Sequence, residues 1–182
     1  QPIVPSELDF KPDQIVFLRK IARKTWRYFE TFVTADDNWL PPDNYQEAPV
    51  PRLASRTSPT NLGLALLANL VARDLGHLSV GGLIQRTKDT FATMQRLERY
   101  RGHFYNWYDT RTLQPLRPLY VSSVDSGNLA GHLLTLGSGL GELIGQSVLD
   151  SEVFAGLRDT AAILGESAKL AMEELDAELN NT

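Results

Sequence analysis

Apolar residues recur three or four positions apart through most of this 182-residue chain. Such spacing gives each segment one apolar stripe and predicts helices that pack through those stripes. We therefore predict a single all-α domain over residues 14–182, after an extended lead-in over residues 1–13 that holds three prolines. The predicted helices are 14–34, 58–76, 79–101, 126–143 and 151–180, with Gly165 marking a point at which the last one can break.

The same spacing predicts which side chains face the core. Basic residues between positions 20 and 27 of the first helix form its solvated face. The predicted inward residues are Leu18, Ile21, Ala22, Thr25 or Trp26, Phe29, and Phe32 or Val33 in the first helix, Leu62, Leu66, Leu67, Leu70 and Val71 in the second, and Leu83, Ile84, Thr87, Phe91, Met94 and Leu97 in the third.

Capping residues and glycines predict where the helices begin and end. Asp13 is the predicted N-cap of the first helix, and Ser58 followed by Pro59 begins the second. Gly76 closes the second helix and Gly102 closes the third. The fourth helix is rich in glycine, which requires close packing against a neighbour or an irregular course. Its glycines include Gly131, Gly137, Gly139 and Gly141.

Composition excludes several classes of function. The chain has no cysteine, which excludes disulfides, thiolate chemistry and cysteine-based metal sites. Its net charge of −4 gives no indication of a nucleic-acid partner or a polybasic membrane patch. No apolar run approaches the roughly 18 residues that span a bilayer, and no signal segment is present. We expect a soluble chain, and its start at Gln1 favours a piece of a longer protein or a processed product.

Four segments at helix ends or in loops combine amides, carboxylates and hydroxyls, two of them with aromatic rings. Sugars have apolar C–H faces that lie on aromatic rings and hydroxyls that bind amides and carboxylates. Brought together at one end of the helices, the segments predict a carbohydrate site. Their acids, including Asp43, Glu47, Asp109 and Asp125, are available for glycosidic chemistry. The segments are WLPPDNYQE at 39–47, SRTSPTN at 55–61, GHFYNWYDT at 102–110 and SVDSGN at 123–128.

Purely structural roles remain open for several of these residues. Trp39 or Trp107 can be a core aromatic that covers a helix end. Asp125 and Ser126 can form only an N-cap, and Asn61 can satisfy buried backbone groups.

The sequence gives no indication of a metal or cofactor site. His77 and His132 have no carboxylate or imidazole at metal-ligand spacing, and a bond from His103 to a carbonyl is the simplest role for that ring. Nucleophile-elbow, phosphate-loop and dinucleotide motifs are absent from the sequence. We therefore expect no cofactor and no metal.

Four motifs in order, WLPPDNYQ, RTSPTNLGL, GHFYNWYDT followed by LQPL, and YVSSVDSGNLAG, resemble the cyclic β-1,2-glucan synthases. The similarity is to the central, glycoamylase-like region that precedes the phosphorylase-like domain, and it is strongest over residues 26–134. It implies part of an (α/α)6-type toroid that acts as a transglycosylase and cyclises β-1,2-glucan chains. It also implies a very large parent in the inner membrane, with this region on the cytoplasmic side and a separate nucleotide-sugar glycosyltransferase domain.

The chain is too short for a complete toroid. Twelve helices with their loops need on the order of 400 residues, and about five helices are predicted here. The resemblance places the catalytic acid of that family beyond residue 182, so the catalytic residues are unassigned. The resemblance does imply residues that line a cleft and contact β-1,2-linked glucose. They are Asp43, Asn44, Gln46, Thr60, Asn61, Tyr105, Asn106, Trp107, Tyr108, Asp109, Asp125, Ser126 and Asn128.

Three functions remain open from the sequence. The first is a glycan-binding portion of the transglycosylase domain, inert by itself, whose partners are β-1,2-glucan and the remainder of the parent chain. The second is a helical interaction or structural module that self-associates through an uncovered apolar helix face. The third is a small glycoside hydrolase that uses Asp43 and Asp109, which requires their carboxyls to lie within roughly 10 Å of each other.

Overall fold

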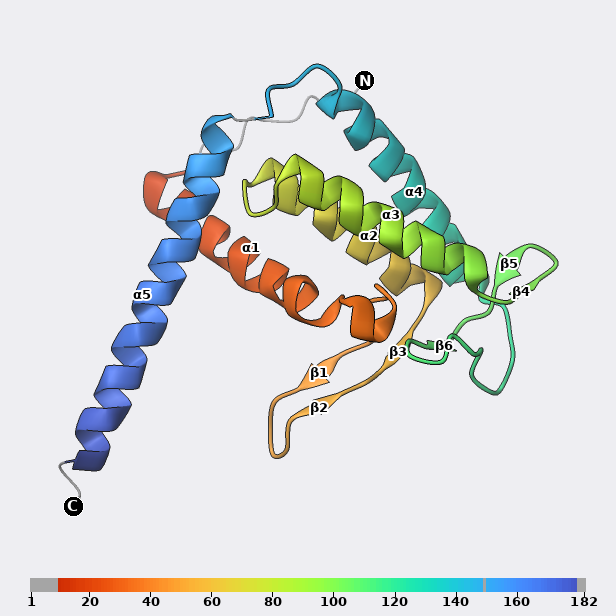
Figure 1. Cartoon of the computed structure of the whole chain (residues 1–182), viewed down its shortest axis with the longest axis horizontal. Helices are drawn as coiled ribbons and strands as arrows, with labels where there is room; N and C mark the ends of the chain where they lie inside the picture. The colour runs from red at the N-terminus through yellow and green to blue at the C-terminus, as the bar shows by residue number, and fades with distance from the viewer. Residues whose placement is uncertain (1–9, 149, 180–182) are drawn as a thin grey trace.

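Helix α2 (Pro59–Asp74) lies at the centre of the fold and packs against α3 (Val80–Arg96) and α4 (Ser123–Leu143) (Figure 1). Helix α1 (Pro12–Phe32) contacts α2 on another side. Helix α5 (Ser151–Leu179) contacts α1 and then extends away from the other helices (Figure 1). The described part of the chain is thus mostly helical, as predicted. None of its helices combines the length and the apolarity that crossing a bilayer requires.

The computed structural model describes residues 10–148 and 150–179, and side chains as far as residue 169. Short antiparallel strand pairs occur both before α2 and after α3. The sequence predicted only the second of these excursions. The remaining elements are the 3-10 helix η1 (Ala35–Asp37) and three strand pairs: β1 (Tyr45–Gln46) with β2 (Arg52–Leu53), β3 (Arg56–Thr57) with β6 (Tyr108–Asp109), and β4 (Arg99–Tyr100) with β5 (His103–Phe104).

Serine side chains cap the N-termini of α2 and α4. The Ser58 hydroxyl accepts the backbone N–H of Asn61 at 3.2 Å and so caps α2, as predicted. The hydroxyl of Ser122 accepts the backbone N–H of Asp125 at 3.1 Å and caps α4. Helix α4 therefore begins before the predicted residue 126, and Asp125 and Ser126 lie in its first turns rather than at its N-cap.

Helix α1 begins at Pro12, and Asp13 is not its N-cap. Lys11 is the N-cap, and its backbone N–H donates to the Gln14 side chain at 2.9 Å. Proline at the first helical position has the φ that a helix needs and lacks only an N–H that would have no helical partner. Residues 12 and 13 of the predicted lead-in are therefore helical, whereas residues 1–9 lie outside the described residues.

Helix α3 ends at Arg96, five residues before the predicted end. A two-residue turn follows between β4 and β5, where Arg101 has φ 50° and Gly102 has φ 87°. Positive φ at both central positions is the geometry of a type I′ hairpin turn. Gly102 therefore turns a hairpin and does not end the helix.

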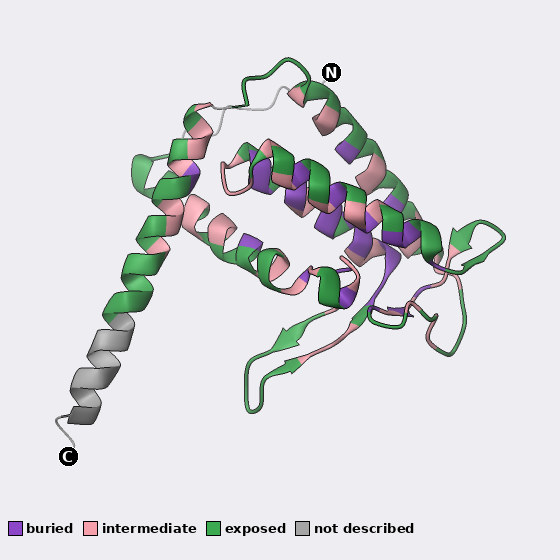
Figure 2. Ribbon diagram, in the orientation of Figure 1, coloured by how far each residue is buried: buried purple, intermediate pink, exposed green. Residues whose placement is uncertain are grey.

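The core lies where α2, α3 and α4 meet the loop that carries Leu40 and the stretch around Tyr108 (Figure 2). In α2 and α3, two predicted inward residues are wrong: Val71 and Ile84 are 51% and 60% exposed. Threonines take part of the inner face of α3 instead, since Thr90 and Thr93 are buried. The buried cluster comprises Leu40, Leu62, Leu66, Leu70, Leu83, Met94, Leu97, Tyr108, Leu129 and Leu136.

The predicted apolar stripe of α1 is only partly covered. Trp26 and Val33 are buried, but Leu18 and Ile21 are exposed. The N-terminal half of α1 contacts α5 mainly through charged side chains, which leaves much of the apolar stripe open. Arg19 illustrates this, since it forms ion pairs of 3.0 Å with both Glu152 and Asp159.

Glycines make close contacts where α4 crosses α2 and where α5 meets the turn between α2 and α3. A Cβ on Gly139 of α4 would overlap the Leu70 side chain of α2, so the predicted close packing holds there. Around Gly131, Gly137 and Gly141 the space is open, and the prediction is wrong for these three. Helix α5 is continuous through Gly165.

A second glycine contact joins α5 to the turn between α2 and α3. A Cβ on Gly156 would overlap the Gly76 carbonyl, and Gly76 itself has φ 74°.

Candidate functional site

The pairing of β3 with β6 brings the aromatic stretch next to the start of α2. Arg56 lies opposite Asp109, and Thr57 lies opposite Tyr108. Trp107 and Asn106, which precede β6, therefore lie close to the segment that leads into α2. The first turn of α4, with Asp125, reaches the same place because α4 packs along α2.

Asp43 is the hub on one side of this site. Its Oδ2 accepts hydrogen bonds from Arg56 Nη2 at 2.8 Å and Nε at 3.1 Å, and from Asn44 Nδ2 at 3.1 Å. Its Oδ1 accepts from Asn61 Nδ2 at 3.4 Å. Asp43 thereby connects the loop after α1 with the first turn of α2.

Asp125 is the hub on the other side. Thr60 Oγ1 donates to Asp125 Oδ1 at 2.7 Å, and Asn128 Nδ2 donates to Thr60 Oγ1 at 3.1 Å. Partial burial would raise the pKa of Asp125, but hydrogen bonds from Ser122, Thr60 and Ser58 outweigh it and hold that pKa below its ordinary value. Asp125 is therefore an ionised acceptor at neutral pH.

The buried amide of Asn106 links Asp125 to Trp107. One orientation of this amide satisfies every neighbour. Its NH2 group then donates to Asp125 Oδ2 at 2.9 Å, and its oxygen accepts from Trp107 Nε1 at 2.8 Å and from the Tyr120 hydroxyl at 2.7 Å. Asn106 is thus a positioning residue that fixes the indole ring relative to the Asp125 carboxylate.

Arg56 closes the arrangement, because its guanidinium carbon lies 4.8 Å from the centroid of the Trp107 ring. These contacts, together with the peptide bond between Thr60 and Asn61, form a closed path through residues from four separate segments of the chain. We call this path the polar circuit. Its members are Asp43, Arg56, Trp107, Asn106, Asp125, Thr60 and Asn61.

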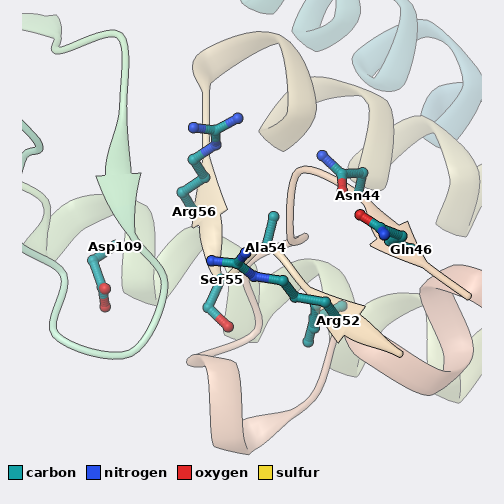
Figure 3. A pocket seen from close by; sticks show the side chains of 8 residues that line it. Asn44, Gln46, Arg52, Ala54, Ser55, Arg56 and Asp109 are labelled. Atoms are coloured by element: carbon teal, nitrogen blue, oxygen red, sulfur yellow. The ribbon is translucent and has the colours of Figure 1, made fainter. Parts of the chain in front are cut away.

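A hollow of about 470 Å³ adjoins the polar circuit at Arg56. Figure 3 shows Asp109 on one side of it and Asn44 and Gln46 on the other, with the Arg52 side chain reaching toward Ser55. Its lining residues are Asn44, Gln46, Arg52, Leu53, Ala54, Ser55, Arg56 and Asp109.

Asp109 organises a turn at the edge of this hollow. Its Oδ1 accepts the backbone N–H groups of Arg111 at 2.9 Å and Thr112 at 2.8 Å. Burial would raise the pKa of Asp109, but these backbone donors, the Thr112 hydroxyl and the Arg111 charge together hold it below its ordinary value.

Four predicted cleft residues lie outside the polar circuit and the hollow. One of them, Asn128, contacts the polar circuit through its bond to Thr60. Tyr108 is fully buried in the core, where its hydroxyl donates to the Glu98 carbonyl at 2.7 Å, so its prediction as a cleft residue is wrong. Tyr105 lines a separate hollow of about 250 Å³ with Tyr120 and its neighbours. The backbone N–H of Ser126 donates to the Ser122 carbonyl, and its side chain has no hydrogen bond among the described residues.

Arg56 is the member of the polar circuit that was not predicted from the sequence; Arg52 and Ser55 in the hollow were not predicted either. Arg56 belongs to the SRTSPTN segment, yet a lone arginine before an N-cap resembles an ordinary surface cation. Arg56 lies beside the aromatic stretch only because β3 pairs with β6, and the sequence alone does not predict that pairing.

In the part of the chain that the structure describes, no three histidine or acidic side chains are grouped as a metal site would require. His77 instead faces Asp159, with 3.0 Å between Nε2 and Oδ2. Independently of this, the carboxylates and amides of the site can form hydrogen bonds with hydroxyl groups.

Comparison with known proteins gave one sequence relative. Over 163 residues the chain is 51% identical to the cyclic β-(1,2)-glucan synthase NdvB of Rhizobium meliloti (strain 1021). The match covers 89% of this chain and 6% of that protein, so the chain spans a small part of its relative's length. No protein-family model matches.

Solved structures share the fold at low sequence identity. A candidate glucoamylase from Bacteroides fragilis is 18% identical with a TM-score of 0.60, over 87% of this chain and 37% of that one. The endo-β-1,2-glucanase from Chitinophaga pinensis, solved with sophorotriose and glucose, is 16% identical with a TM-score of 0.56, over 84% and 36% of the respective chains.

The resemblance predicted from the four motifs is confirmed: the chain is a relative, over most of its length, of one short segment of a cyclic β-(1,2)-glucan synthase.

Proposed function

We propose that this chain is the glycan-contacting part of a domain that acts on β-1,2-glucan. The observation that carries the proposal is the convergence of Asp43, Asn61, Trp107 and Asp125 from four segments into one polar circuit. These four side chains therefore belong to one connected group. The relative is a synthase of cyclic β-(1,2)-glucan, which supports this class of ligand.

The chemistry of the site suits glucose units. An indole ring accepts the C–H face of a pyranose, and amides and carboxylates bind its hydroxyls. Asn44 and Gln46 supply amides to the hollow beside the polar circuit, while Asp109 supplies a carboxylate. We propose that a glucan chain passes from the hollow across Trp107 toward Asp125.

We further propose that the chain is part of an (α/α) toroid. It covers only 36% to 37% of the solved chains that share its fold, which supports a larger helical domain. In this proposal the parent lies in the inner membrane, with the domain on its cytoplasmic side.

We propose that the isolated chain lacks a complete catalytic centre. Glycoside hydrolysis needs a carboxyl whose pKa is raised, so that it can protonate the leaving oxygen. The pKa values of Asp109 and Asp125 are instead lowered by their hydrogen bonds. Asp43 accepts hydrogen bonds from Arg56 and two asparagines, so both of its carboxylate oxygens already have partners within the chain. These environments count against a hydrolase that uses Asp43 and Asp109.

Titration with linear β-1,2-glucooligosaccharides tests the proposal, with the Trp107 indole N–H followed by NMR. We expect a saturable shift at millimolar ligand that Asp43→Ala and Asn61→Ala weaken. Asp36→Ala and Gln95→Ala, at exposed positions, serve as matched controls. A β-1,4-linked oligosaccharide of equal length tests linkage preference. An unmoved indole signal would refute binding, and glucan turnover by the isolated chain would refute inertness.

A second candidate function is a helical interaction module. The exposed apolar residues Val16 and Phe17 on α1, and Phe154 and Leu157 on α5, favour it. Light scattering discriminates between the two, since a module that self-associates would be larger than 20.3 kDa in solution. A monodisperse monomer would count against it.

A further inference from the structure

We propose that a groove between α1 and α5 is a second carbohydrate site, one that takes a neutral oligosaccharide chain. For its ligand class the inference rests on the proposed function. The site itself is separate: it lies on the other face of the β1–β2 hairpin from the hollow beside the polar circuit.

Two adjoining hollows of about 560 and 330 Å³ form this groove. They share lining residues from both helices, so they form one continuous depression, which we call the α1–α5 groove. Its combined volume is within the range of small-molecule sites. The shared residues are Lys24, Arg27 and Thr31 from α1, with Ile163 and Ser167 from α5.

The alternation of side chains along β1 separates the two sites. Asn44 and Gln46 line the hollow beside the polar circuit, whereas Tyr45 and Glu47 line the α1–α5 groove. Successive residues of a strand point to opposite faces, so one short hairpin carries polar groups into both depressions.

Aromatic rings form one wall of the groove. The Tyr28 and Phe32 ring centroids are 5.3 Å apart, and those of Phe32 and Tyr45 are 4.8 Å apart. The Tyr28 hydroxyl donates to the Pro42 carbonyl at 2.8 Å, which fixes that ring. Tyr45 is 37% exposed, so the outermost ring of this stack is accessible to a pyranose face.

Unused polar groups face the same space. In the described part of the chain, Arg27 and Glu47 have no hydrogen bond or ion pair, so a guanidinium donor and a carboxylate acceptor are both available for sugar hydroxyls. The other charges are compensated: Arg23 pairs with Glu30 at 3.0 Å, and Lys24 faces Glu166 at 4.0 Å. A lining without a large net charge favours a neutral polyol over a phosphate or another anion.

Because the β1–β2 hairpin lies between the two sites, the second site should raise the affinity for long glucans. A glucan chain long enough to cross the hairpin can occupy both sites at once. Its second contact is then intramolecular, which strengthens binding without any new type of interaction. Short glucans cannot gain from this effect.

Calorimetric titration with β-1,2-glucans of two lengths, sophorotriose and a linear chain of about ten or more glucose units, tests the proposal. We expect the long chain to bind about tenfold tighter, and Tyr45→Ala and Arg27→Ala each to remove most of that gain. Arg27→Ala removes no hydrogen bond or ion pair within the described chain, so we expect it to leave the fold intact. Tyr100→Ala and Arg158→Ala are matched controls at exposed positions.

The outcomes separate this inference from the proposed function. If neither Tyr45→Ala nor Arg27→Ala weakens long-chain binding while the Trp107 indole still responds, the groove is not a glycan site and the polar circuit is. If the indole never responds but both variants reduce binding, the groove binds glucan and the proposed role of the polar circuit fails. If neither length binds, both proposals fail.

Discussion

Arg56 contacts Trp107 and Asp43 with the same guanidinium group. Its Cζ lies 4.8 Å from the indole centroid while its Nη2 donates to Asp43 Oδ2 at 2.8 Å. A planar cation can stack and donate at once, which an ammonium cannot do with the same geometry. This contact holds the aromatic stretch and the loop after α1 in a single arrangement.

Replacement of Arg56 should therefore weaken glycan binding more than it weakens the fold. We expect Arg56→Ala to reduce the affinity for β-1,2-glucan by about one order of magnitude, because it removes a stacking contact and two charge-assisted hydrogen bonds. The side chain is half exposed, so the free energy of unfolding should change by less than ~1 kcal/mol. Calorimetry and urea unfolding measure the two effects. Arg56→Lys, which keeps only the charge, should recover little of the affinity; full recovery would contradict the stacking role.

Asn106 should matter for stability. Its buried amide serves Asp125, Trp107 and Tyr120, and its removal leaves their polar groups without that partner. We expect Asn106→Ala to lower the free energy of unfolding by about 2–3 kcal/mol in urea titrations. Asn128→Ala is the control, since that exposed amide makes a single bond to Thr60 and should cost under ~0.5 kcal/mol. Equal effects of the two variants would contradict this account.

Acid should destabilise the chain in a defined window. The pKa of Asp109 is lowered in the fold from its ordinary 3.8, so the unfolded chain binds the proton more readily. The stabilisation is fully present above the ordinary pKa and is lost as pH falls through the lower, folded-state pKa. Urea midpoints measured between about pH 5 and pH 2.5 should decline less steeply in Asp109→Asn, whose amide oxygen can still accept the turn N–H groups. An unchanged slope would refute the assignment.

Two glycines of α4 provide a matched pair for packing. Gly139→Ala should destabilise by about 1–3 kcal/mol, because the new methyl group overlaps Leu70 and forces α4 from α2. Gly137→Ala meets open space in the same helix and should stabilise by about 0.5–1 kcal/mol through helix propensity. Thermal and urea unfolding of both variants check the signs, and a shared sign would contradict the packing difference.

Local chemistry made the helices predictable. Ser58 and Pro59 mark the start of α2 by capping and by a fixed φ, both of which act within a few residues. Errors arose where two local signals competed. Asp13 was predicted as the N-cap of α1, but the helix begins earlier, with Pro12 at its first position. A helix end was predicted at Gly102, but Arg101 and Gly102 form a hairpin turn there.

The partners within the site could not be predicted in the same way. Asp43 and Asn61 are 18 residues apart, and Thr60 and Asp125 are 65 apart, so their contacts depend on how whole helices pack. Residue types in the polar segments indicated a carbohydrate site, and the pairing of β3 with β6 determined which of them meet. Tyr108 shows that residue type alone is not enough. It belongs to a stretch whose composition predicts sugar contact, yet its ring is buried in the core.

The contact of Gly156 with the carbonyl of Gly76 fixes the rotational phase of α5 about its own axis. Backbone lies against backbone there, so only one azimuth of the helix admits the approach. A single residue inserted between Ser151 and Gly156 would turn the following helix by about 100° and present a side chain where only hydrogen fits. The ion pairs of Arg19 and the groove beside α1 would then lose their counterparts together. The absence of a side chain at Gly156 thus determines how the whole of α5 is aligned.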